Sequence, residues 1–280
     1  MSQHDNPLRK HFRQPAIYLR LPSQGQHYSA GVLDMPPNGE IPILPMTALD
    51  EIITRTPDAL FNGSSTVEVL RSCVPNIRDP WQTPNTDLNA LLVAVRVASY
   101  GHNMDIPSKC PKCGNDHEYE VDLRLVLDNF RSPDYTRPLT LGDLSITFSP
   151  MTYRQVNESS RMRFQDDKTM QTVTALDMPE EEKMRELSNT FRHITEMTIR
   201  TLGESISCIS APDIMVTDQN HIQEFLRNCP KNVFEEIKEF LIRLRQGTEI
   251  QPLSITCGEC QHQYEQQFTL DMSNFFETAS

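Results

Sequence analysis

Two pairs of cysteines constrain the fold of this chain more than any other sequence feature. Each pair has the spacing C-x₂-C, with Cys110 and Cys113 in the first pair and Cys257 and Cys260 in the second. Two thiolates three residues apart on a tight turn can face one ion at about 2.3 Å, and two such turns complete a tetrahedron. Because a strand-like segment follows each pair, the pattern predicts a zinc ribbon with four cysteine ligands and one structural zinc ion per chain.

Other interpretations of the cysteines have less support. The chain has seven cysteines, an odd number, and its N-terminus lacks the apolar segment of a secretory signal, so a complete disulfide framework is not expected. His117 and His262 could each replace a cysteine as a ligand, but they sit at different offsets from their pairs, which favours a surface or packing role. The other thiols, Cys73, Cys208 and Cys229, have apolar or helix-end contexts that indicate buried side chains.

The predicted metal would join two distant parts of the chain, because 143 residues lie between Cys113 and Cys257. Closing an unstructured loop of this length costs on the order of 5 kcal/mol of chain entropy. Structural zinc contributes about 10–16 kcal/mol in small peptides, which exceeds that cost. Four thiolates would also fill the coordination shell, so we expect a structural metal and no catalysis at it.

Turn signals and hydrophobic periodicity divide the chain into five segments. Residues 1–43 are rich in proline and show little helical periodicity, which indicates an extended docking arm. Residues 44–101 predict a small helical unit, and residues 102–150 predict the first zinc knuckle, a strand and a β-hairpin. Residues 151–249 predict a helical insertion, and residues 250–280 the second knuckle and the strand that completes the ribbon. The predicted fold is α+β and mostly helical, with a zinc-ribbon-like β region.

The arm, residues 1–43, contains the candidate partner-binding residues. Its first twenty residues have a local charge of about +3, although the chain as a whole is acidic. Apolar side chains then alternate with Tyr18 and Arg20, as in a strand. Such an arm is typical of a segment that lies along a neighbouring protein, and a disordered tail is the alternative. We assign partner binding to Arg9, Lys10, Arg13, Ile17, Leu19 and Leu21.

Charge and composition argue against several functional classes. The chain has 26 basic and 38 acidic side chains, and its charge of −12 opposes binding to nucleic acid. Both halves of the predicted ribbon are also net acidic, so a nucleic-acid-binding ribbon is a disfavoured alternative. The longest apolar stretch, residues 90–98, is interrupted by Arg96 and is too short for a membrane span. We find no phosphate-binding glycine loop and no catalytic motif, so we expect neither an enzyme nor a small-molecule substrate.

Several stretches resemble one protein family. They are NPLRK at 6–10, QPAIYLRLPS at 14–23, IPILPMTALDEIITRTPDALFNGSSTVEVLRSCVPNI at 41–77, DLNALLVAVRVASYG at 87–101 and CPKCG at 110–114. These segments are similar to the T4-like bacteriophage baseplate hub proteins, a family of hub subunits and hub-assembly factors of contractile-tailed phages. The similarity is most specific across residues 6–150, and the later helical part matches only in general pattern.

The resemblance implies a structural, non-enzymatic component of a contractile phage tail, at the baseplate hub or the adjacent tail tube or sheath. Such a protein would be made and assembled in the host cytoplasm and would reside in the virion, with other baseplate and tail proteins as its partners. A transient hub-assembly chaperone, absent from the mature virion, is the alternative function. The zinc prediction rests on the cysteines of this sequence and not on the resemblance.

Overall fold

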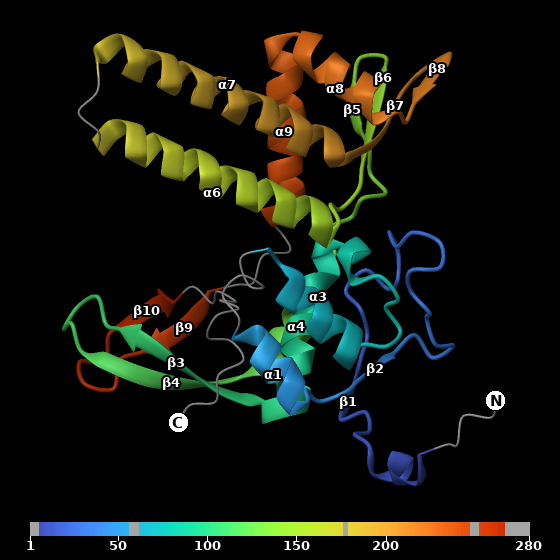
Figure 1. Ribbon diagram of the computed structural model, residues 1–280, viewed down its shortest axis with the longest axis vertical. Coiled ribbons are helices and arrows are strands. Elements are labelled where there is room, and N and C mark those ends of the chain that lie inside the picture. Colours follow the sequence, from blue (N-terminus) through green and yellow to red (C-terminus); the bar gives the residue numbers. More distant parts are fainter. Residues whose placement is uncertain (1–5, 56–61, 176–178, 247–251, 267–280) are drawn as a thin grey trace. The chain divides into compact units, whose positions relative to one another are not determined.

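The structure is a computed structural model that describes residues 6–55, 62–175, 179–246 and 252–266, and within these ranges the chain forms two compact units (Figure 1). The first unit draws on 1–80, 87–130 and 250–280, and the second on 81–86 and 131–249. The fold is α+β and mostly helical, as predicted. The first five residues of the predicted arm and residues 267–280 of the last predicted segment lie outside the described residues.

Among the described residues, three helices form the core of the first unit. They are α1 (Ala48–Thr54), α3 (Ser64–Cys73) and α4 (Asn85–Tyr100), and short 3₁₀ helices occur at η1 (Pro7–His11) and η2 (Pro80–Gln82). The sequence of α4 is apolar on nearly all sides, and residues 90–95 are all buried. A helix that is apolar all round lies at the centre of its unit.

The arm contributes to the core of the first unit. Strand β1 (Ile17–Leu19) pairs antiparallel with β2 (Ile41–Ile43). The alternating row places Leu19 and Leu21 in the interior, whereas Tyr18 points to solvent. The backbone N–H of Leu44, directly after β2, donates to the carbonyl of Cys73 at the end of α3, at 2.8 Å. The apolar row of the arm is therefore covered by the chain itself.

Arg13 attaches the start of the arm to the helices. Its guanidinium donates to the carbonyl and the hydroxyl of Ser72, both at 2.7 Å, and to the carbonyl of Pro45. It also lies 3.3 Å from the carboxylate of Asp50, a buried side chain. Asp50 in turn forms a capping box with Thr47 at the start of α1, which is the capping pattern that the sequence contains. One arginine thus connects the arm to both α1 and α3.

Two hairpins complete the first unit. One consists of β3 (Asn103–Lys109) and β4 (Asp116–Asp122), and the other of β9 (Leu253–Thr256) and β10 (Gln263–Gln266). The sequence predicted β4 but not β3, because Asn103, Asp105 and Pro107 all disfavour a strand. A short helix that the sequence analysis did not predict, α5 (Leu123–Asn129), follows β4.

The second unit combines a four-stranded sheet with four helices. The strand order is β5 (Leu139–Leu141), β6 (Leu144–Phe148), β7 (Ile206–Ala211) and β8 (Ile214–Val216), and all neighbours are antiparallel. The helices are α6 (Tyr153–Ala175), α7 (Glu180–Glu204), α8 (Gln219–Asn228) and α9 (Lys231–Gln246). No helix among the described residues has both the length and the apolar character needed to span a bilayer.

The second unit differs from the predicted helical insertion at 151–249 in two respects. It includes 81–86 and 131–150, and with them the β5–β6 hairpin, and it contains a second hairpin, β7–β8, between α7 and α8. Ile146 and Phe148 of β6 lie opposite Ile209 and Ile206 of β7, and all four side chains are buried. This pairing joins strands separated by two long helices, so no local pattern indicates it.

One buried cluster joins the sheet to α7, α8 and α9. Phe148 of β6 stacks on Phe240 of α9 with ring centroids 5.2 Å apart, at the centre of this core. The cluster consists of Tyr135, Ile146, Phe148, Ile199, Leu202, Ile206, Ile209, Ile222, Leu226, Ile237 and Leu241. Helix α6 contributes none of these residues, so it is held mainly by its antiparallel neighbour α7.

We expect Arg13→Ala to lower the free energy of unfolding by about 2–3 kcal/mol, because it removes hydrogen bonds of a charged donor and leaves the buried carboxylate of Asp50 without its cation. The matched control is Arg20→Ala, whose ion pair with Glu40 at 3.2 Å is largely exposed and should contribute little. Urea unfolding of both variants measures the difference. Equal losses would show that the Arg13 contacts do not hold the arm.

Candidate metal centre

Four cysteine thiols come together in the first unit. The Sγ atoms of Cys110, Cys113, Cys257 and Cys260 all lie within 4.8 Å of one another. Cys110 and Cys260 are 3.7 Å apart, and Cys113 and Cys257 are 3.6 Å apart. Sulfur ligands of a tetrahedral zinc ion with bonds of about 2.3 Å are separated by about 3.8 Å, whereas a disulfide bond measures about 2.05 Å. The four predicted ligands therefore lie close enough together to bind one metal ion, and two of their sulfur–sulfur distances match a tetrahedral site.

The turn that contains the first cysteine pair connects β3 to β4. The backbone N–H of Cys110 donates to the carbonyl of Asn115, and the carbonyl of Cys110 accepts from the N–H of Gly114, both at 2.9 Å. Gly114 has a φ of +72°, in the left-handed region that favours glycine. These bonds fold the turn tightly enough for Cys110 and Cys113 to face the same point.

The second cysteine pair lies on an equivalent turn between β9 and β10. The N–H of Cys257 donates to the carbonyl of His262, and the carbonyl of Cys257 accepts from the N–H of Gln261, again at 2.9 Å. Gln261 occupies the position of Gly114 and also has a positive φ, +57°. The two turns thus share one hydrogen-bond pattern, and each presents two thiols to the same site.

Backbone N–H groups of the turns favour the thiolate form that binds metal. Burial raises the pKa of the Cys110 thiol, but the N–H groups of Cys113 and Lys112, together with hydrogen bonds from the thiols of Cys113 and Cys260, bring the pKa to about 6. The N–H of Cys260 likewise lowers the pKa of Cys257, against the opposing effect of burial. Less free energy is then needed to deprotonate Cys110 and Cys257 when a metal binds. The N–H of Asn115 lowers the pKa of Cys113, but burial and hydrogen bonds with the other three thiols raise it to about 12.

The two hairpins also contact each other beside the thiols. The Ser108 hydroxyl of β3 lies 2.8 Å from the Tyr264 hydroxyl and donates to the side-chain carbonyl of Gln266 at 2.9 Å, both on β10. On the other strands, the Tyr119 hydroxyl lies 3.5 Å from the carbonyl of Thr256. These contacts fix the approach of the hairpins and therefore the position of the thiols.

The two histidines lie beside the thiol cluster rather than in it. The Nε2 atom of His117 is 3.7 Å from the Sγ of Cys257 and 3.0 Å from the side-chain amide of Asn115. The ring of His262 stacks on Tyr264. The group of mutually close ligand atoms contains the four cysteines and neither histidine.

The six candidate partner-binding residues do not form one surface. Arg9 and Lys10, in η1, have exposed side chains, and Ile17 is half-buried. Arg13 makes the contacts described above, and Leu19 and Leu21 lie in the core. The exposed apolar side chains near them are Leu8, Phe12 and Tyr18, which the sequence analysis did not select because alternation assigns only one face of a strand.

A family model described as T4 bacteriophage base plate protein matches residues 34–277. The chain belongs to this family. No curated protein and no solved structure matches the chain. This base plate protein is therefore a structural component of a phage tail that interacts with other base plate proteins, as the resemblance implied. Both cysteine pairs lie inside the matched range, whereas residues 6–33 of the arm precede it.

We expect Gly114→Ala to lower the free energy of unfolding by about 1 kcal/mol, because a side chain makes the left-handed backbone of this turn unfavourable. An added Cβ would meet no atom within 4 Å, so the loss would come from the backbone conformation alone. Gly258→Ala is the matched control, since Gly258 also has open space around it and lacks the positive φ. Metal competition with a chelator should show weaker binding for Gly114→Ala only. An equal effect of both substitutions would contradict the assigned role of Gly114.

Proposed function

We propose that this base plate protein is a structural subunit at the hub or the adjacent tail tube or sheath, and that it remains in the mature virion. Zinc bound by Cys110, Cys113, Cys257 and Cys260 joins the chain segments that precede and follow the second unit. The exposed end of the arm binds a neighbouring subunit. The observation that carries this proposal is the cluster of four thiols within 4.8 Å of one another in a chain of the base plate family.

The donor set supports zinc as the metal. Four thiolates suit a soft or borderline ion and do not suit magnesium or calcium, which prefer oxygen ligands. A Cys₄ zinc site has no open coordination position, so zinc here stabilises the fold and does not activate water or substrate. This role agrees with a structural protein. The metal would stabilise a region that is too small to have a large hydrophobic core.

The geometry of the arm supports a division of its residues between two roles. Arg13, Leu19 and Leu21 hold the arm on the first unit. Arg9 and Lys10 remain exposed beside Leu8 and Phe12, whose exposed fractions are 61% and 53%. Exposed apolar side chains next to cations fit a surface of a neighbouring protein that is apolar and acidic.

The zinc proposal predicts about one zinc ion per chain in purified protein, measured by elemental analysis. Cys113→Ser should remove the zinc and make the segments around the two hairpins more susceptible to protease, because one thiolate ligand is lost. Cys208→Ser is the matched control, since Cys208 lies in β7 of the second unit and should leave the zinc content unchanged. Folded protein without metal, in which all four thiols react freely, would contradict the proposal.

The arm proposal predicts that deletion of residues 2–12 leaves a folded protein that no longer enters tails, because the deletion spares Arg13 and the buried part of the arm. Mass spectrometry of purified virions measures the amount of the chain in wild-type and truncated phage. Arg9→Glu with Lys10→Glu should have the same effect, and Arg185→Glu, an exposed charge on α7, is the control. Normal incorporation of the truncated chain would contradict the arm's role. Absence of the wild-type chain from virions would instead favour a transient assembly chaperone.

A further inference from the structure

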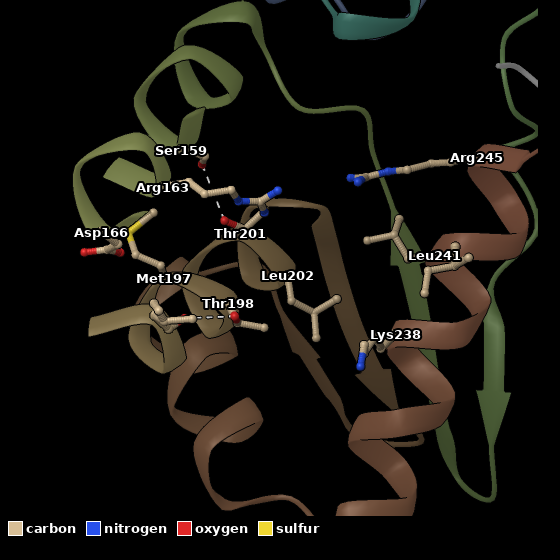
Figure 2. Close-up of a pocket in the computed structure, with 12 residues that line it drawn as sticks. Ser159, Arg163, Asp166, Met197, Thr198, Thr201, Leu202, Lys238, Leu241 and Arg245 are labelled. Carbon is tan, nitrogen blue, oxygen red and sulfur yellow. Dashed lines mark hydrogen bonds between the residues drawn. The ribbon is translucent and has the colours of Figure 1, made fainter. Parts of the chain in front are cut away.

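A cavity of about 290 Å³ lies in the second unit among α6, α7 and α9 (Figure 2). The side chains that line it come from one face of each helix, because their spacing follows the helical repeat of three and four residues. They are Ser159, Arg163 and Asp166 of α6, Ile194, Met197, Thr198, Thr201 and Leu202 of α7, and Lys238, Leu241, Ile242 and Arg245 of α9.

Contacts between α6 and α7 hold one wall of the cavity in place. The hydroxyls of Ser159 and Thr201 are 3.4 Å apart, and the carboxylate of Asp166 lies 2.7 Å from the Nδ1 atom of His193. Leu202 and Leu241 belong to the buried core of the unit, so the base of the cavity is also fixed. The cavity is thus formed by the fold itself and needs no rearrangement to accept a side chain.

The cavity has an apolar base that continues to the surface. Leu202 and Leu241 are buried, Met197 is half-buried, and Ile242 is 47% exposed. An aliphatic group in this position would remove apolar surface of both α7 and α9 from water. A volume of about 290 Å³ is at the small end of ligand pockets, which span roughly 300–1,000 Å³. This size suits one or two inserted side chains of a larger partner better than a whole small molecule.

Cations surround the opening of the cavity. Arg163 of α6 and Arg245 of α9 extend toward each other across it, and Lys238 lies about two turns from Arg245 along α9 (Figure 2). The side chain of Arg163 makes no hydrogen bond or ion pair with any described residue. The lining contains one acid, Asp166, and this carboxylate is engaged by His193. Of the three cations, Lys238 pairs with Glu235 at 3.6 Å and Arg245 donates to the hydroxyl of Ser205 at 3.0 Å. The lining has three cations against one acid, which favours an anionic partner.

We infer that this cavity binds an acidic amphipathic helix of a neighbouring base plate protein. An aliphatic side chain of that helix would fill the space between Leu202 and Leu241, and its flanking carboxylates would pair with Arg163 and Arg245. Helices bind grooves in this way, with apolar anchors at intervals of three and four residues and charges at the edge. The inference rests on the base plate setting for the nature of the partner, and it concerns a surface separate from the arm.

The test uses the full-length, zinc-loaded chain and a synthetic helical peptide as the probe. The probe has 18 residues of Leu, Ala and Glu, with Leu at every third and fourth position and a fluorescent label, and its matched partner carries Lys in place of Glu. Fluorescence anisotropy should detect binding of the Glu peptide, weakened by salt, and no comparable binding of the Lys peptide.

Substitutions around the opening locate the binding site of the peptide. Arg163→Glu with Lys238→Glu should weaken binding of the Glu peptide about tenfold or more. The control is Arg192→Glu with Lys231→Glu, which makes the same charge change at exposed positions of α7 and α9 outside the cavity. Circular dichroism confirms that the variants fold, and the milder Arg163→Gln should give a smaller loss in the same direction.

Three results would overturn the inference. They are equal binding of the Glu and Lys peptides, equal losses for the cavity and control variants, and tight binding of sodium decanoate by a chain that does not bind the Glu peptide. The last result would assign the cavity to a free amphiphilic anion. Because these measurements need no virion and leave the arm intact, their outcome is independent of the test of the proposed tail function.

Discussion

The meeting of four thiols is the constraint on which the first unit depends. Cys113 and Cys257 are 144 positions apart in the sequence, yet their sulfur atoms are 3.6 Å apart. The segments that contain them form only two-stranded hairpins, and an isolated hairpin of this kind is marginally stable in water. A bound metal would supply the stability that two small hairpins lack. It would also hold the β3–β4 hairpin and the β9–β10 hairpin together, although they are far apart in the sequence.

The first hairpin has a particular need for such stabilisation. Asp105 of β3 lies directly opposite Glu120 of β4, and both side chains are exposed on the same face. Like charges at opposite cross-strand positions destabilise a pair of strands. Pro107 also withholds a backbone donor from the ladder. The hairpin nevertheless continues over seven residue pairs, and the contacts that oppose these costs are the cysteine turn and the hydrogen bonds of Ser108 to β10.

The cluster of four thiols could be predicted from the sequence because most of its geometry is local. Two cysteines three residues apart define each turn, and only the pairing of the two turns is non-local. Helix α4 was predictable for a similar reason, since its apolar residues and its end at Gly101 lie within one short stretch. Strands β7 and β8 were not predicted, because β7 is stabilised by β6, some sixty positions earlier in the sequence.

For the arm, the sequence predicts the strand but not its partner. The alternation of Ile17, Leu19 and Leu21 correctly indicated a strand with one apolar face, but such a pattern does not specify which molecule covers that face. Here the partner is β2 of the same chain. The same limit applies to the cavity, because its cations are dispersed over eighty positions of an acidic sequence and become neighbours only when α6, α7 and α9 pack together.

Net charge and local charge have separate consequences for assembly. A net charge of −12 disfavours unspecific association with other strongly acidic surfaces. Cations are concentrated in η1 and around the cavity. At these two places the local charge attracts acidic partners, although the net charge of the chain is negative. Because complementary charge affects specificity and the rate of encounter more than final affinity, apolar groups beside the cations must supply the binding energy. Leu8 in η1 and Phe12 directly after it, and Leu241 and Ile242 in the cavity, occupy those positions.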